Sequence, residues 1–300
     1  MDKKAVSAVW LAETDLTNLN SGVGGSNLVD LKKYKKNKID YPYVSGQAMR
    51  YYLKESIRRL VNSNEYCVAN EKGETCGDIT NCILCDLFGF MTTMKDKGAQ
   101  TRVSPIKMSP AIGLLPLNDN MTIDFLTRRK PQEKAGELKG DIVNVELGVN
   151  LYKAGLSIDL VKIGSEEVIE EGHIINERKV SSDDIIKNRV KIALEAFKNI
   201  SSYSKQARVL TDFTPNFIVL AVQNRYNHLL QKAIDLGTGR TLNTERLDQV
   251  LDSLNGNKLY AGLLSGTLEN EEEIKKVLIK HGIALKTPTE AIDMVIKEVD

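Results

Sequence analysis

Residues 41–50 read Tyr-Pro-Tyr-Val-Ser-Gly-Gln-Ala-Met-Arg, and they mark the point where an extended segment becomes a helix. Ser45 is placed to cap that helix, because a serine side chain accepts a hydrogen bond from the free amides of a first turn. Apolar residues then recur at helical spacing as far as about Val61, at Met49, Leu53, Ile57 and Leu60. The basic residues Arg50, Lys54 and Arg58 follow one another at four-residue spacing, so they share one edge of the predicted helix.

The segments around this helix predict a mixed α+β protein. Strands are expected at residues 5–17, 121–126, 141–151, 156–163 and 217–222, and a second long helix at 183–200. This order is βαββαβ, the pattern of ferredoxin-like and RNA-recognition-type sheets. Residues 18–40 read as a long loop rich in glycine and lysine, and residues from 227 onward as mostly helical.

Composition excludes several classes of protein. The 300 residues hold 41 Lys+Arg and 40 Asp+Glu, and 42% are apolar, which fits a globular protein and not a disordered one. No apolar run approaches the roughly 18 residues of a membrane helix, so we expect a cytoplasmic protein with no membrane partner. The charge is uneven, with 11 Lys/Arg and 6 Asp/Glu in residues 1–60 but 7 and 11 in residues 241–300. That polarity suits a protein that holds a polyanion on one side, or one whose copies stack.

Four cysteines lie within 19 residues, at Cys67, Cys76, Cys82 and Cys85. Cytosolic disulfides are rare, so the cluster is either a metal site or a set of plain thiols. Four thiolates can complete a tetrahedral zinc shell, which would order a polar segment that has no core of its own. A structural zinc and a simple buried thiol at Cys85 remain the two alternatives.

Basic residues outside the first helix suggest contacts with a nucleic-acid backbone. The lysines of residues 32–38 and the segment 205–208 would form a positive rim above the sheet. Such contacts bind phosphates without reading sequence. The glycines between residues 22 and 25 lack the Gly-Lys-Ser/Thr of a nucleotide-binding loop, and no nucleophile or carboxylate pair predicts an enzyme.

Three motifs are similar to those of a known superfamily. Residues 41–50 resemble the Pro-x-x-Ser-Gly-x-x-x-Arg motif that opens the first helix of CRISPR proteins of the RAMP superfamily. Residues 82–89 resemble its Cys-x-x-Cys-x-Leu-Phe-Gly motif, and residues 204–215 resemble the thumb segment of one branch. That branch is the DevR family of subtype I-B, the backbone subunit of Cascade-type surveillance complexes. The three motifs span most of residues 1–225.

The resemblance implies one right-hand-shaped domain. Its palm would comprise about residues 1–62, 121–200 and 215–240, with a fingers insertion at 63–120, a thumb at 201–214 and a C-terminal helical part at 227–300. Copies would stack along a CRISPR guide RNA, beside other Cascade subunits, and the guide would pair with a target DNA strand. Backbone subunits of this kind are not enzymes.

The residues expected to bind RNA lie in the first loop, the first helix, the insertion and the thumb. They are Asn20, Gly22, Gly24, Gly25, Lys32, Lys33, Ser45, Gly46, Gln47, Arg50, Lys54, Lys107, Lys205, Gln206 and Arg208. Related subunits cut RNA with an aspartate in the loop after the first strand, so a nuclease that uses Asp30 or Asp40 is the alternative. An unrelated zinc-stabilised α+β protein is the third hypothesis.

Overall fold

The computed structural model describes residues 3–21, 28–94, 98–129, 140–170, 173–203 and 209–300. Its helices are α1 (Gly46–Arg58), α2 (Ile83–Phe88), α3 (Asp183–Lys198), the 3₁₀ helix η1 (Leu229–Lys232), α4 (Thr244–Ser253), α5 (Glu271–Lys280) and α6 (Pro288–Val299). The strands of the N-terminal half are β1 (Ala5–Thr17), β2 (Leu28–Val29), β3 (Lys33–Lys36), β4 (Ile39–Val44), β5 (Phe90–Met94), β6 (Gly98–Arg102), β7 (Ile106–Met108) and β8 (Ala111–Gly113). The others are β9 (Met121–Arg129), β10 (Gly140–Asp159), β11 (Ser165–Glu170), β12 (His173–Lys179), β13 (Phe217–Gln223), β14 (Lys258–Leu263) and β15 (Leu285–Lys286).

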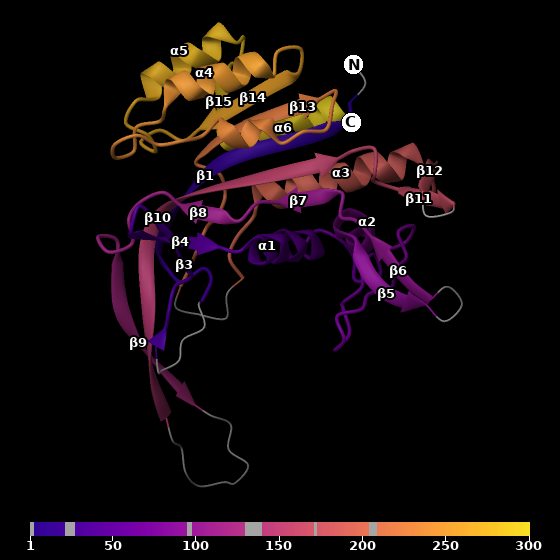
Figure 1. Ribbon diagram of the computed structural model, residues 1–300, viewed down its shortest axis with the longest axis horizontal. Helices are drawn as coiled ribbons and strands as arrows, with labels where there is room; N and C mark the ends of the chain where they lie inside the picture. The colour runs from indigo at the N-terminus through magenta and orange to yellow at the C-terminus, as the bar shows by residue number, and fades with distance from the viewer. Residues whose placement is uncertain (1–2, 22–27, 95–97, 130–139, 171–172, 204–208) are drawn as a thin grey trace.

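A large sheet runs through the molecule and confirms the expected α+β class (Figure 1). Its order is β15-β14-β13-β1-β10-β8-β4-β3, and β2, β7 and β9 also pair with β10. The central strand β1 is antiparallel to both of its neighbours, β13 and β10. Helix α1 follows β1 in the chain, and α3 lies between β10 and β13.

Strand β1 supplies both hydrophobic cores, because its two faces are apolar. Val6, Ala8 and Trp10 point into a first core formed with α1, α2, α3 and α6. Val9 and Leu11 point into a second core with η1, α4 and α5. Helices therefore cover both faces of the sheet (Figure 1).

Strand β10 is one strand where the sequence predicted two. The expected break between residues 151 and 156 does not occur, and β10 pairs with β1 from Thr14 to Ala5 without interruption. Gly155, inside the segment where the break was expected, permits a close approach: a Cβ there would lie 1.8 Å from Oε1 of Gln231. The glycine is needed for packing against η1 and not for a turn.

Two further expectations need correction. Residues 18–40 are not one long loop, because β3 and β4 form a hairpin over a two-residue turn at Asn37 and Lys38, with φ of 52° and 68°. Asn-Gly is the usual sequence of such a turn, and Asn-Lys lacks that signal. The C-terminal part is also not only helical, since β14 and β15 extend the sheet there.

Candidate nucleic-acid interface and cysteine cluster

Helix α1 begins as the sequence predicted. The Ser45 hydroxyl accepts a hydrogen bond from the amide of Ala48 at 3.3 Å, which confirms the N-cap. The Asn20 side-chain oxygen accepts from the amide of Ser45 at 3.0 Å, so Asn20 positions the start of the helix. Gly46 lies against the next segment, because a Cβ there would lie 3.3 Å from the Met108 carbonyl oxygen. Gln47 is exposed, so the first turn of α1 presents a polar side chain to solvent.

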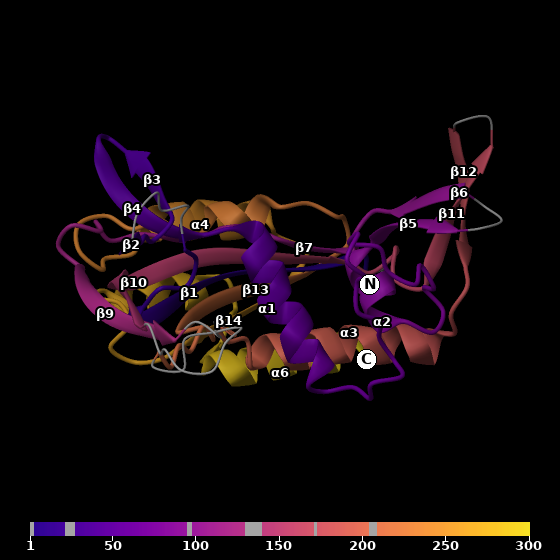
Figure 2. The same cartoon turned by 90° about the horizontal axis from the view of Figure 1, so that it is seen from below.

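Figure 2 shows α1 crossing the face seen from below, between β9 and the β3–β4 hairpin on one side and α2 and the β5–β6 hairpin on the other. Tyr51, which the sequence analysis did not select, is 47% exposed on this helix. An exposed aromatic ring beside Gln47 offers a stacking surface for a base or ribose. Helical spacing from Gln47 was the signal that could have found it.

Arg50 makes contacts within the protein that the sequence did not predict. Its guanidinium donates to the carbonyl oxygens of Phe88 at 2.8 Å and Ile106 at 3.4 Å, and stacks on the Phe88 ring at 5.5 Å. Burial lowers its pKa. These contacts join α1 to the segments that contain Phe88 and Ile106, and the predicted RNA contact of Arg50 stays a prediction.

Lys54 is half-buried on the same edge of α1. Its ammonium lies 5.2 Å from the centre of the Phe88 ring. Burial lowers its pKa, and the positive charges of Arg50 and Arg58 lower it further. Within the described ranges, its ammonium makes no hydrogen bond or ion pair. Arg58, by contrast, pairs with Glu55 and stacks on Tyr66 at 5.6 Å.

The remaining predicted contacts fall into three groups. The Lys33 ammonium pairs with the buried carboxylate of Glu146 at 3.0 Å, so it is held within the protein. Lys32 is half-buried, and Lys107 is exposed over the ring of Tyr226 at 5.5 Å. The predicted contacts at Gly22, Gly24, Gly25, Lys205, Gln206 and Arg208 lie outside the described residues.

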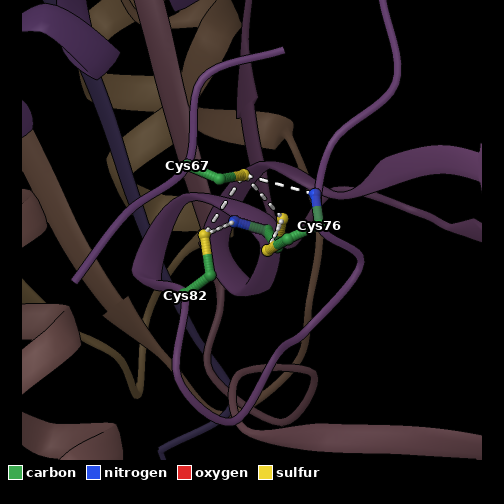
Figure 3. A group of neighbouring side chains, drawn as sticks. Cys67, Cys76 and Cys82 are labelled. Carbon is green, nitrogen blue, oxygen red and sulfur yellow. Dashed lines mark hydrogen bonds between the residues drawn. The ribbon is translucent and has the colours of Figure 1, made fainter. Parts of the chain in front are cut away.

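The four cysteines come together as the spacing predicted (Figure 3). Their sulfur atoms all lie within 4.8 Å of one another. The Sγ of Cys67 is 3.6 Å from those of Cys82 and Cys85, and the Sγ of Cys76 is 3.5 Å from that of Cys85. All four are free thiols. Sulfurs of a tetrahedral zinc site, each about 2.3 Å from the metal, lie about 3.8 Å apart, so the donor set fits zinc.

Backbone amides support a metal-binding interpretation of the cluster. The amide of Cys76 donates to the sulfur of Cys67, and that of Cys85 to the sulfur of Cys82, each at 3.4 Å. Hydrogen bonds from Cys85 lower the pKa of the Cys82 thiol to about 5. The thiolate, the form that binds metal, is therefore favoured at Cys82, whereas desolvation raises the pKa of Cys76 and the hydrogen bond with Cys82 raises that of Cys85.

A buried ionic network, which the sequence analysis missed, holds the cysteine segment against the sheet. Asp86 is fully buried and accepts hydrogen bonds from Arg102 at 2.6 Å and Arg189 at 2.7 Å. Both of its oxygens also accept from the amide of Gly164 at 3.0 Å. Asp86 directly follows Cys85, but nothing in the sequence pairs it with arginines 16 and 103 residues away.

The nuclease alternative gains no support from the positions of its two aspartates. Asp40 pairs with Lys35 at 2.9 Å. Within the described ranges, neither Asp30 nor Asp40 belongs to a group of three or more His, Cys, Asp or Glu side chains that could hold a metal. In the same part of the chain, no helix is long and apolar enough to cross a membrane.

Comparisons with known proteins agree with the motifs. The fold is similar to that of a chain in a solved "CRISPR RNA-guided surveillance complex", with a TM-score of 0.59, 15% identity, and coverage of 99% of this chain and 100% of that one. A chain of a "CRISPR RNA-guided surveillance complex, pre-nicking" gives a TM-score of 0.60 at 12% identity, with the same coverage. A search of curated proteins finds no match.

A family model settles the relationship. The model described as "CRISPR-associated negative auto-regulator DevR/Csa2" matches residues 9–234, which is more than half of the chain. The match includes α1, the cysteine cluster and the central strands of the sheet. The chain therefore belongs to the DevR/Csa2 family of CRISPR-associated proteins, as its motifs predicted.

Proposed function

We propose that this protein is a backbone subunit of a CRISPR RNA-guided surveillance complex and holds the guide RNA across the face that carries α1. One observation carries the proposal: Gln47, Tyr51 and Lys54 follow one another at helical spacing on α1, Gln47 is exposed, Tyr51 is 47% exposed, and Lys54 makes no ion pair among the described residues. Figure 2 shows α1 crossing the face seen from below. A lysine ammonium binds phosphate, and an exposed aromatic ring stacks on a base. Family membership and the fold likeness support the assignment to such a complex.

The order of strands in the sheet is consistent with the palm of a right-hand-shaped protein. Strands β13, β1, β10 and β7, with α1 and α3 as their connections, fit a ferredoxin-like βαββαβ palm. We assign the fingers to residues 63–120, the thumb to 201–214 and a separate C-terminal part to 227–300. Copies of the chain would stack along the guide beside other subunits, and the guide would pair with a target DNA strand. In this proposal the protein performs no chemical step.

Co-purification with RNA tests the guide-binding role. The chain is expressed with a CRISPR array and purified, and the retained RNA is sequenced. We expect RNA of one guide length from the wild-type protein and several-fold less from Lys54→Gln, because one phosphate contact is lost. Lys276→Gln, an exposed lysine of α5, is the matched control. Absence of bound RNA from the wild-type protein at low salt would refute the proposal.

We further propose that the four cysteines bind one structural zinc ion. Zinc would neutralise the charge of the thiolates and cross-link the segment between Cys67 and Cys85. This segment is mostly polar and contributes few buried apolar side chains of its own. We expect one zinc per chain by elemental analysis of the purified protein, and loss of the metal in Cys82→Ser. Zinc-free wild-type protein with normal stability would contradict this assignment.

A further inference from the structure

The β3–β4 hairpin concentrates positive charge at one edge of the sheet. Five lysines and one aspartate lie between residues 32 and 40. Figure 2 shows the hairpin standing out from the body, at a corner away from the centre of α1. Like charges held this close repel one another, so the cluster lowers stability unless an anion compensates it.

The charged side chains on one face of the hairpin form ion pairs within the protein. Because side chains alternate along a strand, Lys33, Lys35 and Asp40 share one face. Lys33 pairs there with Glu146 and Lys35 with Asp40, at 3.0 and 2.9 Å. These ion pairs neutralise that face within the protein.

The opposite face combines rings with an unpaired cation. Tyr34 stacks on Tyr41 at 5.5 Å and meets Tyr43 edge-on at 6.5 Å. The Tyr34 hydroxyl donates to the carbonyl oxygen of Gly113 at 3.0 Å and fixes the rings to β8. Lys36 follows on the same face, opposite the exposed side chain of Ile39.

The turn residue Lys38 is held in an unfavourable backbone conformation. Its φ of 68° is one that glycine adopts readily and that a side chain with a Cβ does not. Both Lys36 and Lys38 are exposed, and their ammonium groups find no partner in the described part of the chain. A glycine at this position would be less strained than the lysine that occupies it.

We propose that the tip of this hairpin is a second contact for nucleic-acid phosphates, made by Lys36 and Lys38 and separate from α1. The inference rests on the proposed function and moves the contact from Lys32 and Lys33 to the turn. Anchored rings beside flexible lysines are a common arrangement for holding single-stranded nucleic acid without reading its sequence. The phosphates belong either to the guide or to the strand paired with it.

Replacement of Lys38 by glycine separates binding from folding. Lys38→Gly removes the charge and also relieves the backbone strain, so we expect an unchanged or higher Tm. We expect about fivefold weaker binding of nucleic acid and a salt dependence (log Kd against log salt) that is shallower by about 0.7 for each lysine removed. Lys38→Arg keeps the charge and should retain binding, Lys36→Gln should add to the loss, and Lys276→Gln is the control.

The binding experiment has two arms, both with the full-length chain. In the first, fluorescent guide-length RNA is titrated with each variant. In the second, the preformed RNA complex is titrated with complementary single-stranded DNA. A loss confined to the first arm assigns the tip to the guide, and a loss confined to the second assigns it to the target strand.

Two negative results have different meanings. If the wild-type protein binds RNA and DNA but Lys36→Gln/Lys38→Gly binds both equally well, the hairpin inference is wrong and the proposed function stands. If the wild-type protein binds no RNA at low salt, the proposed function is wrong, and so is the inference that rests on it.

Discussion

Asp86 lies at the junction of three segments distant in sequence. Its carboxylate is the common acceptor for Arg102 of β6, Arg189 of α3 and the amide of Gly164. Arg189 also donates to the carbonyl oxygens of Ile79 and Thr80 in the cysteine segment. The network therefore joins the proposed fingers to α3 and to the turn at Gly164 through charged groups that are largely buried.

Asp86→Asn should lower the free energy of unfolding by about 3 kcal/mol, because two buried arginines lose their counter-charge. Urea unfolding followed by circular dichroism measures the effect. Glu167→Gln removes a partly exposed carboxylate that pairs with Lys162, and it should change stability by less than about 1 kcal/mol. Equal effects of the two substitutions would contradict the role given to burial.

The residues differ in how far the sequence could define them. Ser45 was predictable because its cap is a local interaction, and the cysteines because their clustering along the chain persists in space. The contacts of Arg50 were not predictable, because its acceptors are backbone carbonyls, which carry no sequence signal. Asp86 required knowledge of contacts over more than 100 residues.

At the scale of elements, zinc should control the order of the segment between α1 and β5. Chelation of the metal would remove the link between the exposed Cys76 and the half-buried Cys67 on one side and the buried Cys82 and Cys85 on the other. We expect hydrogen exchange to rise several-fold in residues 62–82 after chelation and to stay unchanged in β1 and β13. A uniform rise across the chain would show instead that the metal supports the whole fold.

Helices α4 and α5 are linked by a pH-sensitive contact. The pKa of Asp248 is held below its usual value by hydrogen bonds from Lys280 at 2.7 Å and from His281. A carboxyl group whose pKa is lowered by folding stabilises the protein above its unfolded pKa of 3.8, and that contribution is lost as the pH falls further.

Wild-type protein should therefore have a higher free energy of unfolding than Asp248→Asn at neutral pH. This difference should become smaller below about pH 4. Urea midpoints measured from pH 6 to pH 3 would show it. Because the carboxylate is exposed, added salt should also narrow the difference at pH 6. A difference that stays constant through the acid range would mean that the ionised form makes no contribution.

Elements were predictable where one periodicity persisted for several turns or pleats. Strand β1, helix α3 and strand β13 have the bounds expected within two residues. The β3–β4 hairpin was missed because β3 consists of three lysines and one tyrosine, so only β4 shows an apolar alternation. Strand β14 was missed because amphipathic segments surround it. Strand β10 was predicted as two strands, 141–151 and 156–163, whereas its pairing with β1 runs through residues 152–155.

At the scale of the whole molecule, the two cores share one sheet. We expect them to unfold together, because β1, β13 and β10 contribute side chains to both. Leu251→Ala, in the second core, should cost about 2–5 kcal/mol. Fluorescence of Trp10, the one tryptophan and a member of the first core, should report the same shift in urea midpoint as circular dichroism. A tryptophan transition that did not move would indicate two independent units.

The position of β1 in the middle of the sheet also affects how the chain folds during its synthesis. Residues 5–17 leave the ribosome before the strands that flank them, since β10 is complete only at Asp159 and β13 only at Gln223. At about 5–20 residues per second, β1 waits on the order of 10–40 s for its second neighbour. During that time a strand with two apolar faces and two open edges is exposed to other nascent chains. The yield of native protein should therefore respond more to the speed of translation and the supply of chaperones than to changes on the folded surface.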